Sequence, residues 1–581
     1  MKYLSNFLVL TFAILIMSVA AFGQTETTGN IEGTITDQTG AVVPNIAVTI
    51  KNQSVSSGAS AVASASGSQG FSRTVTADAS GFFRVLQVPP GVYEVTTPAA
   101  NGFAESRYEN VQVTLGRTAQ LNIQLNTGTA VVVVDVASSE QALDTTGSEI
   151  STSITARRIE LLPKGVDFTS ALKAVPGTRP DPIAGGFSVD GATNSENTFV
   201  IDGQEVTNYR NAGVNNNNMV PFQLVQEVQV KSSGFEAEYG GATGGVINVA
   251  TKGGSNDIHG EVGMQMISSR LNGDSRPTLL RFSSGTGSGF VQTNEFFRAP
   301  KAKALNVYPT ASLGGRIIKD RLWFFGSYSP QILEQTVDTT FYTNAPAATR
   351  TVRAVDTYHQ KQRLEYAFGR LDAQPFSKLR LTGSYLWNPV ITEGLLPFGT
   401  ASFGGADNPV DFGGNIGVLG GSQLRAKQGG RNNGNNVTGQ AVYTLSESIL
   451  ASFRFSRGFL NEKGNNYFVP TGNRYNCLVG NSGGTTFPGA CPQGLLSPST
   501  TQTVKDVSVR TTYEGDITFL FDLGGRHQIK AGYARSKIFN DLQANFSQTV
   551  FLCYGDYRIN AMCNNIQNST ATPNPDAIGA G

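Results

Sequence analysis

Apolar and polar residues alternate along the C-terminal part of the chain, from residue 257 to residue 581. In residues 379–387, Leu381 and Tyr385 share one face, whereas Arg380 and Thr382 share the other. Strands of roughly ten residues with apolar side chains toward lipid and polar ones inward are typical of membrane barrels. Strands of soluble sandwiches are usually shorter, about 5–6 residues. The pattern therefore predicts a mainly β protein whose 257–581 segment is part of a transmembrane antiparallel β-barrel, with soluble strands as the alternative.

The alternation yields nine or ten candidate strands in this region. They are residues 258–268, 306–318, 321–329, 361–373, 378–388, 435–446, 448–461, 503–522 and 526–538, with a possible further one at 546–560. Residues 314–326 (GGRIIKDRLWFFG) predict a hairpin that turns at Lys319 and Asp320. We expect Trp323, Phe324 and Phe325 to contribute to an aromatic girdle at the membrane surface.

Residues 24–128 contain short apolar runs at regular spacing, separated by Gly and Pro turns, which predicts a β-sandwich. The pieces Ile31-x-Gly33-x-Ile35-x-Asp37-x-x-Gly40, Ser80-Gly81-x-Phe83 and Val88-Pro89-Pro90-Gly91-x-Tyr93 resemble the carboxypeptidase regulatory-like domain. The resemblance implies a transthyretin-like, carbohydrate-binding-like fold. It implies no peptidase, since the stretch lacks a zinc-binding His/Glu arrangement. The domain is either a spacer or a glycan-binding module.

Residues 150–256 combine two short predicted helices, 154–162 and 168–175, with a strand at 225–231 and several Gly-containing turns. Asp-Gly after a β-branched run is a tight-turn signal, and glycine pairs permit positive φ and close packing. The motif residues are Asp190, Gly191, Asp202, Gly203, Tyr239, Gly240, Gly244, Gly245, Thr251 and Lys252. Together these pieces resemble the α+β plug domain of TonB-dependent outer-membrane receptors, and most closely the Oar-like group, which carries an N-terminal regulatory-like domain.

Between these two domains, in the linker 129–149, lies the run TAVVVVDV at residues 129–136. Such a β-prone segment forms a buried core strand or adds to the exposed sheet edge of a partner. Its placement resembles the energy-coupling box of TonB-dependent receptors, which implies the TonB protein as a partner. The coupling candidates are Val131, Val132, Val133 and Val134.

The resemblance also implies a barrel of 22 strands, more than the candidate strands found here. An open sheet would leave unpaired edges in lipid, so we expect the chain to be incomplete at its C-terminus. The Asn-rich plug loop 208–218, with Tyr209 and Arg210, is a candidate ligand-facing segment, the alternative being a plain turn.

The N-terminal residues 1–23 predict a secretory signal peptide, with Lys2 at the start, an apolar run at 7–19 and Ala21-Phe22-Gly23 before the cleavage site. The run is too short for a comfortable membrane anchor. Export permits disulfides, so we expect two local loop bridges, Cys477 with Cys491 and Cys553 with Cys563. The alternative of a metal site lacks nearby His.

Composition narrows the possible functions. The 581 residues include 66 Gly and 24 Pro, and only 15% are charged, against roughly 25% in an ordinary soluble domain. The net charge of +1 argues against a nucleic-acid partner, which calls for a basic excess. The sequence shows no catalytic constellation and no cofactor or metal motif, so we do not expect an enzyme.

Two functions remain. The first is a TonB-dependent receptor of the outer membrane, with sandwich and plug on the periplasmic side, that takes up a large, scarce ligand such as a siderophore or an oligosaccharide. The second is a non-transporting surface protein that binds glycan or mediates adhesion. Binding of TonB to residues 129–136 distinguishes the two.

Overall fold

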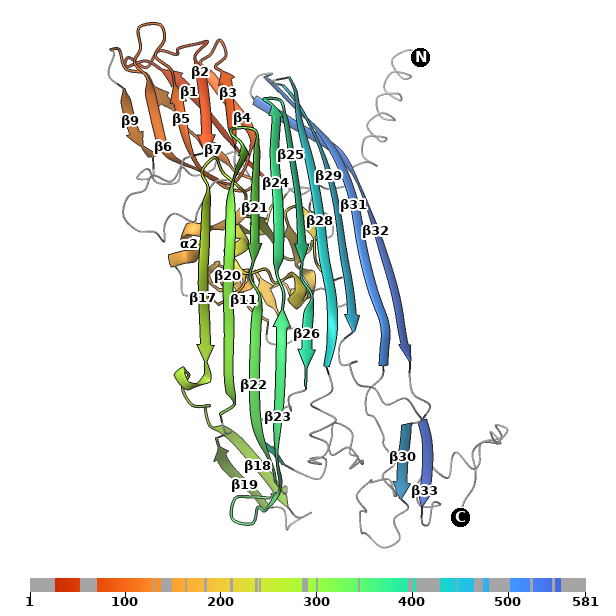
Figure 1. Ribbon diagram of the computed structural model, residues 1–581. Coiled ribbons are helices and arrows are strands. Elements are labelled where there is room, and N and C mark those ends of the chain that lie inside the picture. Colours follow the sequence, from red (N-terminus) through yellow and green to blue (C-terminus); the bar gives the residue numbers. More distant parts are fainter. Residues whose placement is uncertain are drawn as a thin grey trace, which may run out of the picture.

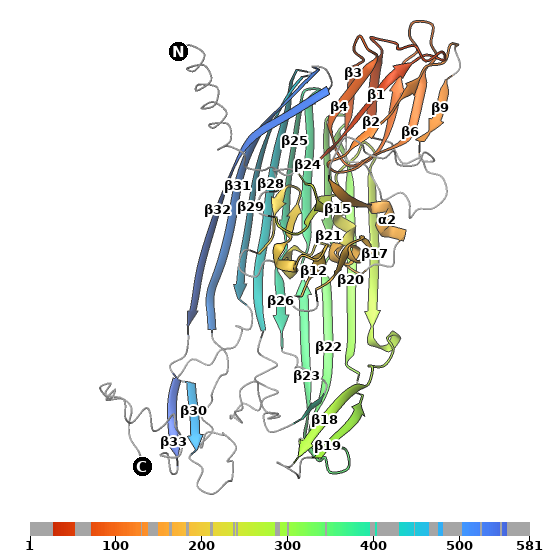
Figure 2. The same cartoon turned by 180° about the vertical axis from the view of Figure 1, so that it is seen from behind.

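A computed structural model shows three parts: a small sandwich, a plug and a tall curved sheet (Figures 1 and 2). The structure describes residues 27–52, 71–128, 131–136, 149–161, 165–181, 185–208, 213–235, 239, 242–284, 291–298, 301–342, 345–394, 401–403, 429–446, 448–463, 474–479, 502–522, 526–545 and 549–554. The predicted signal peptide, residues 1–23, lies outside them. Among the described residues, no helix has the length and apolar composition that a membrane crossing requires.

The sandwich consists of two facing sheets, as the sequence predicts. One has the order β4-β1-β7, with β8 also paired with β1, and the other has the order β3-β2-β5-β6-β9. Its strands are β1 Gly29–Thr36, β2 Ala47–Asn52, β3 Ser72–Thr76, β4 Phe82–Val88, β5 Gly91–Thr97, β6 Ser106–Val113, β7 Thr118–Gln120, β8 Ile123–Gln124 and β9 Val132–Asp135. Alternate residues of β1 and β5 are buried, so Ile31, Val48 and Val95 fill the space between the sheets.

The plug contains a five-stranded sheet of order β10-β15-β16-β13-β14 and a separate two-stranded sheet, β11-β12, together with short helices. Its strands are β10 Ile150–Thr155, β11 Thr178–Pro180, β12 Phe187–Val189, β13 Thr198–Ile201, β14 Gln204–Glu205, β15 Val225–Ser233 and β16 Val246–Thr251. Its helices are α2 Ala156–Leu161 and the 3-10 helices η3 Phe168–Ala174, η4 Asn194–Glu196, η5 Asn216–Asn218 and η6 Phe222–Leu224. Every residue of the central strand β16 is buried, and the plug core continues into the wall through Phe325, Tyr366 and Phe368.

The first predicted plug helix, 154–162, begins later than expected. Ile154 and Thr155 belong to β10, because they pair with Val228 and Glu227 of β15. The second predicted helix, 168–175, is a 3-10 helix that ends at Ala174. Its first turn is capped by Asp167, whose carboxylate accepts a hydrogen bond of 2.9 Å from the Thr169 N–H.

The third part is a sheet of 13 strands that curves around the plug (Figures 1 and 2); we call it the wall. Its strands are β17 His259–Ser268, β20 Lys303–Ile318, β21 Leu322–Tyr328, β22 Gln331–Tyr342, β23 Val352–Leu364, β24 Ala367–Phe376, β25 Leu379–Trp387, β26 Val390–Glu393, β27 Ala401–Phe403, β28 Gly429–Ser446, β29 Ile449–Lys463, β31 Gln502–Asp522 and β32 Arg526–Asn545. A 3-10 helix, η8 Ser269–Leu271, follows β17.

The wall has the predicted two faces. Tyr385, Phe453 and Tyr513 point away from the plug side and are 48%, 51% and 48% exposed. The intervening Ser452 and Arg454 are buried. Apolar residues outward and polar residues inward are the arrangement of a membrane-embedded barrel strand.

Three long strands of the wall are broken where they pass the plug. The breaks lie between β21 and β22, between β23 and β24, and between β25 and β26. The ladder continues across them, for example through Asn388 N–H to the Gly434 carbonyl at 3.0 Å and Glu365 N–H to the Pro389 carbonyl at 2.9 Å. The single strand expected at 361–373 is therefore wrong, since the chain breaks there between Leu364 and Ala367.

The hairpin at residues 314–326 is confirmed in its turn but not in its aromatic girdle. Asp320 has φ +59° in the turn between β20 and β21, which pair from Ala311 to Ile318. Trp323 and Phe325 are buried, at 1% and 3% exposure. The Trp323 Nε1 donates to Asn256 Oδ1 at 2.9 Å. The girdle expectation is wrong for these two residues because they face the plug.

Two short strand pairs, one antiparallel and one parallel, lie at the end of the molecule opposite the sandwich (Figure 1). They are β18 Thr278–Ser284 with β19 Val291–Phe297, and β30 Arg474–Val479 with β33 Thr549–Tyr554. Cys477 and Cys553 lie on the neighbouring strands β30 and β33, one register position apart. Cys491 and Cys563 lie outside the described residues, so the two bridges remain predictions.

Candidate functional site

The hairpin β13–β14 carries the plug motif Asp202-Gly203 to the wall. Val200 pairs with Glu205 and Ile201 with Gln204, which leaves a two-residue turn. Asp202 has φ +48° and Gly203 has φ +79°, and positive φ at both central residues is the tight hairpin turn that Asp-Gly favours. The sequence expectation of a tight turn here is correct.

The Asp202 carboxylate joins the turn to the rest of the plug. It accepts hydrogen bonds from the Thr251 N–H at 2.9 Å and the Thr251 hydroxyl at 2.6 Å. Thr251 ends β16, the central plug strand. Two residues of the predicted plug motif, 49 positions apart in sequence, thus form one contact.

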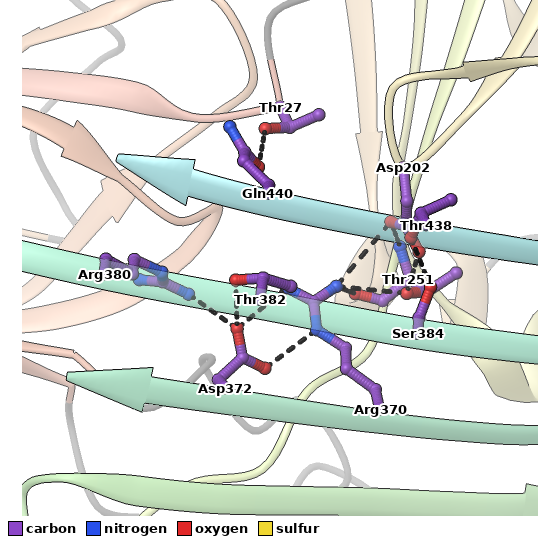
Figure 3. A network of polar contacts seen from close by, with 10 residues as sticks. All are labelled: Thr27, Asp202, Thr251, Arg370, Asp372, Arg380, Thr382, Ser384, Thr438 and Gln440. Carbon is purple, nitrogen blue, oxygen red and sulfur yellow. Dashed lines mark hydrogen bonds and ion pairs between the residues drawn. The ribbon is translucent and has the colours of Figure 1, made fainter. Parts of the chain in front are cut away.

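The same carboxylate faces a charged cluster on the inner face of the wall (Figure 3). Arg370 of β24 lies 3.6 Å from Asp202 and donates to both carboxylate oxygens of Asp372, at 2.8 and 3.1 Å. Asp372 also accepts from Arg380 at 3.0 Å and from Thr382 at 2.9 Å. The side chains of Arg370 and Asp372 are 6% and 1% exposed, so two cations and two anions balance one another in a buried place.

The other side of the turn is bound to the wall as well. Gln204 donates to Asn436 Oδ1 at 2.9 Å, and the Arg510 guanidinium lies 2.9 Å from the Glu205 carboxylate. A Cβ on Gly203 would lie 3.2 Å from Thr27, so the turn is also closely covered. We call the buried charged group of Asp202, Arg370, Asp372 and Arg380 the plug latch, and the Glu205–Arg510 pair forms its rim.

A second contact between plug and wall is made by neutral amides. Asn217 of η5 donates to the backbone carbonyls of Asn388 and Asn432 at 2.6 and 3.1 Å. Asn388 donates in return to Asn217 O at 2.5 Å and to Asn218 Oδ1 at 3.1 Å, and Asn436 donates to Asn218 Oδ1 at 2.9 Å. We call this set the Asn network. Asn388 occupies the break between β25 and β26, so the break orients its amide toward the plug.

A cavity open to solvent lies between the Asn-rich loop and the wall. Its lining mixes amides and hydroxyls with one aromatic and one cationic side chain, including Asn208, Asn215, Asn436, Phe459, Ser508 and Arg510. Such groups suit a polar ligand that offers hydrogen-bond donors and acceptors. Tyr209 and Arg210, the predicted ligand-facing residues, lie outside the described residues, next to Asn208 of this lining.

The remaining plug motif residues serve the plug itself. Asp190 and Gly191 form an exposed turn after β12, with φ +47° and +90°. A Cβ on Gly244 or Gly245 would lie 2.7 Å from Asn197 or 2.8 Å from Val189, which explains the close packing expected of this pair. Gly240 lies outside the described residues.

Tyr239 and Lys252 are both buried in the plug. The Lys231 ammonium lies 4.8 Å above the Tyr239 ring and 2.6 Å from the Glu149 carboxylate. Lys252 donates its N–H to the Leu224 carbonyl at 2.8 Å. The buried Lys231–Glu149 pair was not anticipated, because nothing in the sequence spacing links residue 149 to residue 231.

The predicted coupling run forms β9 at the edge of the sandwich. β9 pairs in parallel with β6, with Val132 opposite Ser106 and Asp135 opposite Glu109. It is the last strand of its sheet in the described part of the chain. Val131, Val133 and Val134 are 52%, 56% and 37% exposed, so the run is an edge strand and not a buried core strand.

The buried carboxylate of Glu227 holds the sandwich against the plug, and no sequence pattern marks this residue. Glu227 of β15 accepts from the Leu115 N–H at 3.1 and 3.2 Å, and Gln229 donates to the Leu115 carbonyl at 2.7 Å. Burial raises the pKa of Glu227 to about 7, although the Leu115 N–H and the Arg117 charge act in the opposite direction. Leu115 thus docks on the plug by both of its backbone polar groups.

The sandwich also contacts the wall beside the latch. Gln374 donates to the Ser72 carbonyl at 3.0 Å, Arg73 donates to the Thr444 hydroxyl, and the Arg380 guanidinium lies 5.8 Å from the Phe71 ring. Arg380 is also a member of the charged cluster around Asp372. Sandwich, plug and wall therefore meet at one junction.

The described residues contain no group of three or more His, Cys, Asp and Glu side chains that could hold a metal ion. The arrangement is one of recognition and mechanical attachment: a plug held in a lipid-facing β-wall by a charged latch, with an edge strand nearby.

Comparison with known proteins identifies the parts. Residues 30–126 match the carboxypeptidase regulatory-like domain, and residues 142–246 match the TonB-dependent receptor plug domain. The TonB-dependent transporter Oar of Myxococcus xanthus is 31% identical over 267 residues, which are 44% of this chain and 24% of that protein. The chain thus spans about a quarter of the length of this curated relative.

Solved structures of similar shape include the outer-membrane transporter YddB of Escherichia coli, with 14% identity, a TM-score of 0.45 and coverage of 69% of this chain and 50% of that one. They also include a mutant of the ferric enterobactin receptor PfeA of Pseudomonas aeruginosa in complex with enterobactin. The identity there is 15%, the TM-score 0.41, and the coverage 68% of this chain and 50% of that one.

The two domain matches show that the chain carries a carboxypeptidase regulatory-like domain and a TonB-dependent receptor plug domain, and the match to Oar shows that this part of the chain is similar to a TonB-dependent transporter.

Proposed function

We propose that this chain is an energy-coupled receptor that admits a large, scarce, polar ligand through the outer membrane. The observation that supports this most is the plug latch, which closes the space inside the wall with buried charges. A plug fixed by such contacts requires an external input to move, because separating a buried ion pair leaves charges without partners.

The input enters through β9, which pairs with a strand of a TonB-type protein on the periplasmic side. Backbone alternation supports this assignment. The Val132 N–H donates to the Glu105 carbonyl at 2.9 Å, toward β6, and successive residues of a strand point their N–H groups to opposite edges. The Val133 N–H therefore faces the outer edge, where a partner strand adds by main-chain hydrogen bonds.

The ligand belongs to the siderophore or oligosaccharide class. The cavity beside the Asn network supports this proposal, since its amides and hydroxyls, with Phe459 and Arg510, match a ligand rich in oxygen atoms. In this proposal the sandwich does not bind the ligand, because its contacts through Leu115 and Ser72 hold it against the plug and the wall.

The test is a titration of the membrane-embedded receptor with the periplasmic domain of its TonB-type protein. Val133→Pro removes the outward N–H and leaves the inward ladder to β6, a position where an edge strand tolerates proline. The variant should lose binding at least tenfold, whereas the matched control Val133→Thr keeps both the N–H and the β-branched shape and should bind normally. Equal binding by Val133→Pro and the unaltered protein would refute the assignment of β9.

A further inference from the structure

The sandwich lies between the coupling strand and the plug, and the two attachments are parts of one strand. β9 is paired along β6 from Ser106 to Glu109, and the side chain of Asn110 donates to the Asp135 carboxylate at 2.9 Å. β6 ends at Val113, two residues before Leu115. The strand that holds β9 is therefore continuous with the residue that docks on the plug.

The dock at Leu115 involves both polar groups of one peptide position. Its N–H donates to the Glu227 carboxylate, and its carbonyl accepts from the Gln229 side-chain amide; Glu227 and Gln229 are alternate residues of β15. Leu115 and Gln229 are fully buried, and Glu227 is 1% exposed. Beside them, Arg117 donates to the Ser151 carbonyl at 2.7 Å. The sandwich therefore also contacts β10, the neighbouring plug strand.

From these contacts we propose that the regulatory-like domain is a load-bearing link: the coupling strand acts while it stays paired with β6, and Glu227 and Gln229 pass the pull to the plug. The inference rests on the proposed function, because it requires a partner that pulls on β9. Glu227 and Gln229 are then positioning residues, which act through Leu115 and touch neither partner nor ligand.

The physical reason is the direction of the load. A pull on β9 along its axis shears all the hydrogen bonds between β9 and β6 at once, whereas peeling would break them one after another. The sheet also offers an outer edge for the partner, so binding does not require β9 to leave β6. The load then runs along β6 into the buried dock, which lies on the central sheet of the plug.

The first experiment locks β9 in place. Glu109 and Asp135 are direct register partners and lie outside the coupling residues 131–134, so the double substitution Glu109→Cys with Asp135→Cys allows a disulfide across the ladder. The matched control is a bridge across β5 and β6, Val92→Cys with Gln112→Cys, which are also register partners. Both oxidised proteins are titrated with the periplasmic domain of the TonB-type protein.

The locked protein should bind the TonB-type domain within twofold of the control, before and after reduction. A loss of tenfold or more that reduction restores would overturn the inference, because it would mean that β9 must leave β6. Failure of the unaltered protein to bind would overturn the proposed function and the inference together, so the two failures are distinguishable.

The second experiment interrupts the dock. Glu227→Ala with Gln229→Ala should leave binding of the TonB-type domain unchanged but reduce the TonB-dependent opening of the plug about tenfold, measured by maleimide labelling of Ala250→Cys, which is 4% exposed in the closed plug. Glu227→Gln keeps one acceptor oxygen in place and should restore most of the opening. Normal TonB-dependent labelling in the double alanine variant would overturn the inference.

Discussion

The plug meets the wall in two places that differ in chemistry. At the latch, Asp202 and the Arg370–Asp372 pair place opposite charges in a buried site. At the Asn network, the contacts are neutral amide hydrogen bonds between Asn217, Asn388 and their neighbours. A buried ion pair that loses one member leaves a charge without compensation, whereas a lost amide bond leaves only a polar group unsatisfied.

This difference suggests a division of roles. The latch is an all-or-none contact, because its four charges are stable only together. The Asn network is a graded contact, since each amide bond contributes separately. The charged contact lies beside the sandwich and the neutral one beside the ligand cavity, so the coupling side of the plug is held more firmly than the ligand side.

The largest effect is expected from Arg370→Met, which removes the cation shared by Asp202 and Asp372. Asp202 then loses its cationic partner and Asp372 keeps only Arg380 as a cation, so we expect the attachment of the plug to weaken by about 3–5 kcal/mol. The measurement is the urea concentration at which a protease first cleaves the plug in the membrane-embedded receptor. Arg370→Lys keeps the charge and should weaken the attachment of the plug less than Arg370→Met does. A midpoint equal to that of the unaltered protein would contradict the assignment of the latch.

The next effect concerns pH and the charged contact between sandwich and plug. Because the pKa of Glu227 is raised to about 7 from 4.5, the docked state binds the proton more tightly than the exposed state. Docking is therefore strongest below about pH 4.5 and weakens as the pH rises through 7, by up to about 3 kcal/mol.

Glu227→Gln removes the titrating group and should flatten this profile. The measurement is the same urea midpoint between pH 5 and pH 8, with the cleavage site placed in the sandwich. A profile of Glu227→Gln that is as steep as that of the unaltered protein would show that another group is responsible.

A smaller loss is expected in the Asn network. Asn388→Ala deletes the amide that donates to Asn217 O and Asn218 Oδ1, and two acceptors then lose a partner. We expect the attachment of the plug to weaken by about 1–3 kcal/mol. This loss should depend little on salt, because no charge is involved. A loss as large as that of Arg370→Met would erase the distinction between the two contacts.

The smallest effect is expected at the rim of the latch. Arg510 and Glu205 form an ion pair whose carboxylate side chain is 45% exposed. An exposed pair of this kind contributes about 0.2–1 kcal/mol and is screened by salt. Glu205→Gln should therefore shift the urea midpoint slightly at low ionic strength. It should not shift the midpoint in 0.5 M salt, because the Debye length is much shorter there than in dilute buffer.

The sequence predicts the architecture well because each part has a local signature. Alternation with long strands marks the wall, and the Asp202-Gly203 pair marks a tight turn whose residues indeed have positive φ. The break at residues 365–366 was missed, because the expected strand 361–373 runs through it, whereas the expected strands 321–329 and 378–388 end close to the other two breaks.

The contacts between the parts could not be predicted in the same way. Asp202 and Arg370 are far apart in sequence, and an isolated Asp-Gly turn does not reveal which wall residue faces it. Glu227 lies within a strand whose alternation is ordinary, and its partner is the backbone of Leu115, which carries no side-chain signal. Val131–134 were anticipated as an extended segment, but the pairing with β6 depends on which sheet edge is within reach.

The central claim is that a pull from the periplasm opens the plug of this receptor at its charged latch. The most direct measurement is the rate of maleimide labelling at Ala250→Cys, beside the latch, in cells with and without the TonB-type protein, quantified at that position by mass spectrometry. The account predicts labelling at least tenfold faster when the coupling protein is present and energised. Equal rates in the two strains would contradict it.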